Sequence, residues 1–207
     1  MKKNYLIFIL LISFGLKAQN IKLLNKDLNL TDTLKHNREI RIYAGGGITN
    51  YSSVFRMYNY EKKNWKAEFY EHYAKVSNDI ELKIEKKKLK PKKNYEFIFL
   101  NFLRSKIMNL PNQEEISWKI QGRDSIYETK TKRRGKEIIE YESVYKSISI
   151  LDGVSYIVQV KEFNKTNEFK YYNPESYYKH FDKIDELLFM TEILNIARNE
   201  FNIWKKN

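Results

Sequence analysis

Residues 39–85 alternate between apolar and polar side chains, in segments separated by short polar interruptions at 61–64 and 77–79. The alternating segments are 39–44, 51–58, 65–73 and 80–85. Successive side chains of a strand point to opposite faces, so this period gives each strand one apolar and one polar face. We therefore predict an antiparallel meander with one face that must be covered.

A helical period replaces the alternation after Asn94. The apolar residues at this spacing are Tyr95, Ile98, Phe99, Phe102, Leu103, Ile107 and Leu110. Asn94 is a suitable N-cap, and Pro111 is a suitable stop. A single apolar stripe implies a single buried face, so we expect this helix to cover the meander.

After Pro111 the order of strands and then helix recurs in looser form. The predicted strands are 116–120, 138–151, 154–163 and 168–172, with a long connection or hairpin at 130–136. An Asp152-Gly153 hairpin turn joins the second and third of these strands. A short helix begins at Asn173-Pro174, and a last helix, capped by Asp182 and Asp185, covers 184–204.

These patterns predict an α+β fold in which antiparallel sheet packs against two or more amphipathic helices. We expect one domain at 39–207, preceded by an irregular lead-in at 19–38 in which Thr31-Asp32 is a weak helix start. Two similar halves, 39–111 and 112–207, are one interpretation of this domain, and a single sheet flanked by two helices is the other.

The first eighteen residues have the features of an export signal. Lys2 and Lys3 precede an apolar run at 5–16, and Ala18 is a small residue at a plausible cleavage site. The run is too short to cross a bilayer as a helix. We predict a signal peptide at 1–18 and a periplasmic or secreted protein without a transmembrane anchor. The alternative is an N-terminal membrane anchor or a buried helix.

The chain contains no cysteine. This excludes disulfides, thiolate catalysis, cysteine metal sites and a lipid-modified cysteine after the signal. We expect no cofactor and no metal. A mature chain of roughly 190 residues must then be stabilised by its hydrophobic core alone.

The formal net charge of +12 falls to +9 without Lys2, Lys3 and Lys17, and two stretches contain the excess, 81–93 and 119–136. Their candidate anion-binding residues are Lys86, Lys87, Lys88, Lys90, Lys92, Lys93, Lys130, Lys132, Arg133, Arg134 and Lys136. Such clusters suit an anionic partner, and export favours lipid, lipopolysaccharide, acidic glycan or a protein over nucleic acid. The alternative is a solvated lysine-rich turn at each place.

No motif with a specific chemistry is present in the sequence. Glu68 and His72 share one strand face and are weak catalytic candidates, against an ordinary solvent-facing surface. Gly45-Gly46-Gly47 lacks the lysine of a phosphate loop, so we predict a turn or bulge there.

Three short segments carry a resemblance: Glu39-Ile-Arg-Ile-Tyr43, Phe55-Arg56-x-Tyr58 and Trp65-x-Ala67-Glu68-x-Tyr70. With the signal ahead of them, they resemble a group of uncharacterised exported bacterial proteins. The resemblance covers about the first third of the mature chain and implies no activity or site.

The first functional hypothesis is a non-catalytic binding module whose two basic stretches form one surface for an anionic or protein partner. The second is a secreted or periplasmic hydrolase with a site assembled from dispersed residues such as Glu68 and His72. The third is an inhibitor or immunity-like protein that blocks the site of another protein, which requires an exposed apolar patch.

Overall fold

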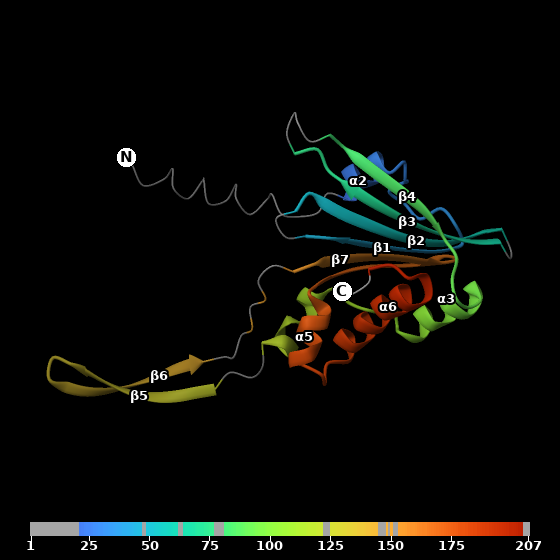
Figure 1. Cartoon of the computed structure of the whole chain (residues 1–207). Coiled ribbons are helices and arrows are strands. Elements are labelled where there is room, and N and C mark those ends of the chain that lie inside the picture. The colour runs from blue at the N-terminus through green and yellow to red at the C-terminus, as the bar shows by residue number, and fades with distance from the viewer. Residues whose placement is uncertain are drawn as a thin grey trace.

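The computed structural model describes residues 21–46, 49–61, 64–76, 81–121, 125–144, 148, 150 and 153–204. The strands are β1 (Arg38–Gly45), β2 (Tyr51–Glu61), β3 (Asn64–Tyr73), β4 (Lys83–Leu89), β5 (Ser125–Arg133), β6 (Lys136–Val144), β7 (Ser155–Glu162) and β8 (Lys165–Tyr172). The helices are α2 (Ile21–Asp27), α3 (Tyr95–Arg104), the 3-10 helix η1 (Gln113–Ile116), α4 (Ser117–Ile120), α5 (Pro174–His180) and α6 (Asp185–Phe201). The predicted α+β class is confirmed (Figure 1). The predicted signal segment, 1–18, lies outside the described residues.

Six strands form one antiparallel sheet in the order β4-β3-β2-β1-β7-β8. The first four are the predicted meander, and β1 pairs with β7 on its other side. Ile42 of β1 therefore lies between Phe55 of β2 and Val158 of β7. The two runs of strands in the sequence join at the centre of a single sheet.

The larger hydrophobic core lies between the sheet and the helices α3 and α6 (Figure 1). Ile42, Phe55 and Val158 are fully buried there against Phe102 of α3 and Leu194 of α6. Burial of one side chain of this size stabilises a fold by about 1.5–3 kcal/mol. The expectation that an amphipathic helix covers the meander is confirmed.

The helix α3 begins as predicted and ends earlier than predicted. Asn94 caps it by accepting a hydrogen bond from the Glu96 N–H at 2.8 Å. The helix ends because Lys106 has a positive φ of 56°, and the N–H groups of Lys106 and Ile107 return to the carbonyls of Leu103 and Phe102. This is a Schellman ending, in which glycine usually takes the left-handed position. Because lysine is not the residue expected at this position, the sequence does not indicate that the helix ends here, and the predicted end at Pro111 is wrong.

The opposite face of the sheet is covered by α2 (Figure 1). Leu24 and Leu28 of this helix pack against Tyr43, Val54 and Tyr70 of the central strands. The lead-in at 19–38 was expected to be irregular, which holds for residues 28–37, but residues 21–27 form this helix ahead of Thr31-Asp32. The sheet is therefore buried on both faces where α2 lies.

Two elements predicted after Pro111 are wrong. Residues 116–120 belong to η1 and α4, because the buried Ile116 and Ile120 lie four positions apart on one helical face. The Asp152-Gly153 hairpin is also absent from the observed pairing, since β6 pairs with β5 while β7 pairs with β1 and β8.

The helices α5 and α6 follow the predicted positions. Pro174 occupies the first turn of α5, as expected. The helix α6 begins after Ile184, and the Asp182 and Asp185 side chains do not cap it.

The strands β5 and β6 form a separate hairpin that projects from the rest of the structure (Figure 1). Arg134 and Gly135 connect them with positive φ angles of 51° and 78°, the turn geometry that matches the twist of paired strands. We call residues 125–144 the arm and the remaining described residues the body. Within the described part of the chain, no helix has the length and apolar character needed to span a membrane.

Candidate functional site

The first basic stretch lies on the edge strand β4 and in the turn before α3. Carboxylates of the body neutralise part of it, in the pairs Lys86–Glu68, Lys87–Glu71 and Lys93–Glu200. In the Lys86–Glu68 pair, Lys86 Nζ lies 2.8 Å from the Glu68 carboxylate. The other candidates, Lys88, Lys90 and Lys92, are exposed and make no ion pair with another described residue.

The second basic stretch lies at the far end of the arm. We call Lys130, Lys132, Arg133, Arg134 and Lys136 the basic tip. All five side chains are exposed. Within the described residues only Arg133 has a carboxylate partner, Glu140 at 3.7 Å, and Arg133 remains 75% exposed. Fewer residues of the basic tip than of the first basic stretch therefore have an ion-pair partner, although the arm also carries Glu128, Glu137, Glu140 and Glu142.

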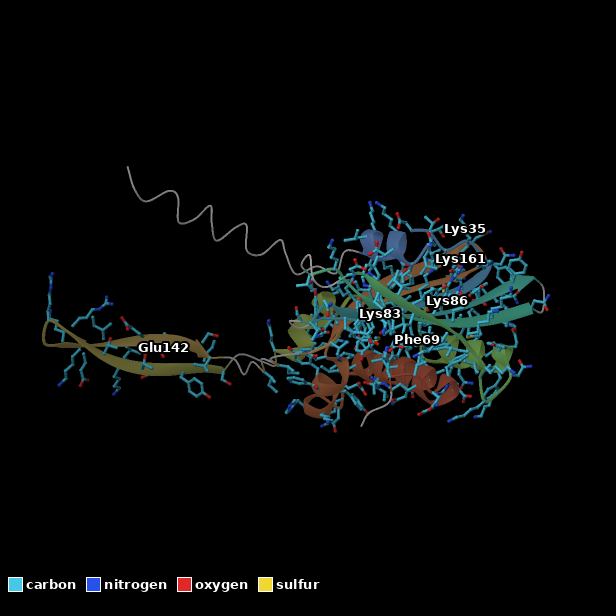
Figure 2. The ribbon with its side chains drawn as sticks, turned by 45° about the horizontal axis from the view of Figure 1, so that its top comes forward. Lys35, Phe69, Lys83, Lys86, Glu142 and Lys161 are labelled. Carbon is cyan, nitrogen blue, oxygen red and sulfur yellow. The ribbon has the colours of Figure 1, made fainter. Side chains whose placement is uncertain are left out.

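The two stretches do not lie side by side. Figure 2 shows Lys83 and Lys86 on the body, while Glu142 marks the arm well away from them. Figure 1 shows the same separation from a second direction. The two basic stretches therefore do not form the one continuous surface that was expected, and each is a separate candidate site.

Glu68 belongs to a row of charged side chains that crosses the sheet on the α2 side. We call Glu39, Arg41, Arg56, Glu68 and Lys86 the polar ladder, since they occupy the four neighbouring strands β1 to β4. Glu39 Oε1 lies 2.8 Å from both Arg41 and Arg56. Arg56 continues to Glu68 at 3.7 Å, and Glu68 contacts Lys86. Opposite charges thus alternate along the ladder.

Both carboxylates of the polar ladder are held ionised. Burial would raise the pKa of Glu39, but the charges of Arg41 and Arg56 outweigh it and lower that pKa below its ordinary value. Burial likewise opposes ionisation of Glu68, and hydrogen bonds from Lys86 and Tyr70 lower its pKa overall. Glu68 is 7% exposed and His72 is 5% exposed. The prediction of an ordinary solvent-facing surface at these two residues is therefore wrong. His72 contacts Asp27 of α2, and Glu68 is enclosed by Arg56, Tyr70 and Lys86.

His72 lies between a hydroxyl group and a carboxylate. Its Nδ1 is 3.3 Å from Ser52 Oγ on the neighbouring strand β2, and its Nε2 is 2.9 Å from Asp27 at the end of α2. A serine, an imidazole and a carboxylate in line are the groups that activate a serine nucleophile. Glu68 is not part of this line, because its partners are Arg56, Tyr70 and Lys86.

The described residues contain no group of three His, Asp or Glu side chains arranged to hold a metal. A groove of about 240 Å³ lies between α3 and α6, with Lys93, Asn101, Arg104 and Glu192 among its lining residues. It is smaller than the roughly 300–1,000 Å³ of most ligand pockets. It also lies on the helix side of the sheet, away from Ser52 and His72.

Sequence reasoning missed Asp27 and Ser52, and it missed the buried charges of Glu39 and Arg41. Polar residues at 39 and 41 alternate with Ile40 and Ile42, which is the pattern of a half-exposed strand. No local signal shows that residues 31–36 return over this face, where Thr31 contacts Arg41 and the backbone of Lys35 and His36 contacts Glu39. The sequence therefore gives no reason to expect buried charges there. Asp27 comes from α2 and is likewise not foreseeable.

Comparisons of this chain with family models, with curated proteins and with solved structures find no match.

Proposed function

We propose that this protein is an exported binding module whose contact element is the arm. One observation supports it above the others: the basic tip presents five cations at the end of a projecting hairpin, with a single ion pair among the described residues. In the first basic stretch, by contrast, body carboxylates pair with Lys86, Lys87 and Lys93. Unpaired, solvent-facing charge costs little in the free protein and is available to a partner.

The partner that suits the basic tip carries anionic groups. Lipid headgroups, lipopolysaccharide, acidic glycans and acidic protein surfaces are the anions that an exported protein meets, whereas nucleic acid is not expected there. The arm also exposes apolar residues behind the tip, with Ile126 74% and Tyr141 72% exposed. Such side chains favour a protein among these partners, which is also what the inhibitor hypothesis requires.

The test compares two triple variants of equal charge. Lys130→Ser, Lys132→Ser and Arg134→Ser neutralise the basic tip, and Lys88→Ser, Lys90→Ser and Lys92→Ser neutralise exposed lysines of the body. Basic residues contribute about 1 kcal/mol each at an anionic surface, so the tip variant should bind roughly a hundredfold more weakly. Binding to phosphatidylserine vesicles, lipopolysaccharide, heparin and poly-glutamate is measured at increasing salt.

The proposal requires that salt and the tip variant weaken the same interaction while the body variant changes it little. Equal losses in both variants would indicate a response to net charge alone. Equal binding by the tip variant and the unmodified protein would contradict a role for the arm.

A second candidate function rests on the line from Ser52 through His72 to Asp27. It is a hydrolase in which Ser52 Oγ attacks the acyl carbon of an ester or amide while His72 takes the hydroxyl proton and passes it to the departing alcohol or amine. Water, deprotonated by the same imidazole, then cleaves the acyl–serine bond, and the carboxylic acid leaves as Ser52 recovers its proton. The line differs from the common arrangement because Nδ1 rather than Nε2 faces the hydroxyl.

A fluorophosphonate probe tests this candidate directly. The hydrolase hypothesis expects Ser52 Oγ to displace fluoride from phosphorus, giving an adduct that peptide mass spectrometry locates. His72→Gln should abolish the adduct, and Ser125→Ala on the arm should leave it unchanged. No adduct at Ser52, or an adduct indifferent to His72→Gln, would rule this function out.

A further inference from the structure

The arm has free strand edges, whereas both edges of the large sheet are protected. On the β8 edge, Asn112 and Gln113 side chains accept hydrogen bonds from the backbone N–H groups of Lys170 and Tyr172 at 3.0 and 2.6 Å. The β4 edge is rich in lysine, which disfavours the addition of another strand. The outer edges of β5 and β6 have no strand partner among the described residues.

A hairpin of this kind is only marginally stable in water by itself. Its side chains are almost all exposed on both faces, including Tyr127 and Ile139. Further strands would bury more of these side chains and satisfy the open backbone groups. The arm therefore has the properties of a sheet that another strand completes.

The charges of β5 identify which strand fits. Glu128 and Lys130 lie on either side of Thr129 and point to the same face. An antiparallel copy of β5 centred on Thr129 places Glu128 of each copy opposite Lys130 of the other. The same register places Tyr127 opposite Thr131, an aromatic residue against a β-branched one, twice. Centring on Glu128 or Thr131 brings like charges together, and centring on Lys130 sets the two Lys130 side chains opposite each other although it also pairs Glu128 with Lys132.

We propose that the protein partner of the arm is a second copy of this chain, paired through β5 about a two-fold axis at Thr129. This inference rests on the proposed function, since it names the partner of the same arm. The product is a four-stranded sheet in the order β6-β5-β5-β6, with the two bodies at opposite ends. The interface is isologous and closes on itself, so it gives a dimer and not a fibre.

Two single charge reversals test this pairing. Lys130→Glu makes both central positions acidic, and Glu128→Lys makes both basic, so each variant alone opposes two like-charge pairs. Each should dissociate roughly tenfold more readily than the unmodified dimer. An equimolar mixture should recover the affinity, because the acidic β5 meets the basic β5. Sedimentation equilibrium at low salt measures all three, and Lys88→Glu on the body is the matched control.

A chain that stays monomeric up to hundreds of micromolar would overturn the inference, and so would a dimer that neither reversal weakens or a mixture that does not recover. A monomer that binds anionic vesicles through the basic tip also overturns it, while the proposed function stands. A dimer weakened by the reversals supports it, even where the tip variant binds none of the four anions.

Discussion

At the scale of residues, Glu39 is the centre of the buried charge. Its two oxygens accept hydrogen bonds from Arg41 and Arg56 and from the backbone N–H groups of Lys35 and His36. The bonds come from the lead-in before β1 and from the strands β1 and β2, so this carboxylate fixes the lead-in onto the sheet. A buried charge is tolerated only where its partners are this complete.

Removing this charge should destabilise the fold strongly. Glu39→Gln leaves the buried Arg41 and the partly buried Arg56 without their common carboxylate, so we expect the free energy of unfolding to fall by about 3 kcal/mol. Urea denaturation at neutral pH measures the loss. Glu140→Gln, which removes the exposed partner of Arg133 on the arm, should change it little.

The same substitution should alter the response to acid. The pKa of Glu39 is lower in the folded protein than its ordinary value, so its contribution is complete above that ordinary value, near 4.5, and is lost as pH falls through the folded pKa. The unmodified protein should lose stability over this range, and the Glu39→Gln protein should lose less. Equal acid responses of the two proteins would contradict the assigned ionisation.

At the scale of elements, the arm is independent of the body. The core residues belong to the body, and none of them comes from residues 125–144. Figure 1 shows the arm extending away from the sheet and from the helices that cover it. The arm thus adds nothing to the hydrophobic core of the body, and its exposed side chains are free for the contact role that we propose.

Replacing residues 125–144 by a short Gly-Ser linker should therefore leave the body folded. We expect its free energy of unfolding to change by less than about 1 kcal/mol, since a longer or shorter flexible loop alters closure entropy only slowly. Far-ultraviolet circular dichroism followed through urea unfolding measures this. A loss of cooperative unfolding would show that the arm supports the body.

At the scale of the whole molecule, the features set by neighbouring residues were predicted from the sequence, whereas the contacts between distant residues were not. The period at 51–58 and the Asn94 cap depend on neighbouring residues, and both predictions are confirmed. The pairing of β1 with β7 joins Tyr43 to Gln159, 116 positions away, and no local pattern specifies it. The contact between Asp27 of α2 and His72 of β3 is of the same kind. The candidate residues Glu68 and His72 were consequently predicted at the surface, although both are buried.

The pairing of β1 with β7 also sets the order in which the chain can fold. The strands β1 to β4 follow one another and can pair early, but the sheet acquires its centre only when residues 155–162 are available. The core closes later still, when the Trp204 ring packs against Phe55 and Phe69. Contacts this distant in sequence make folding slow. If the protein is exported as we propose, we expect this slow folding to lengthen the time that the polypeptide spends unfolded and able to pass across the membrane.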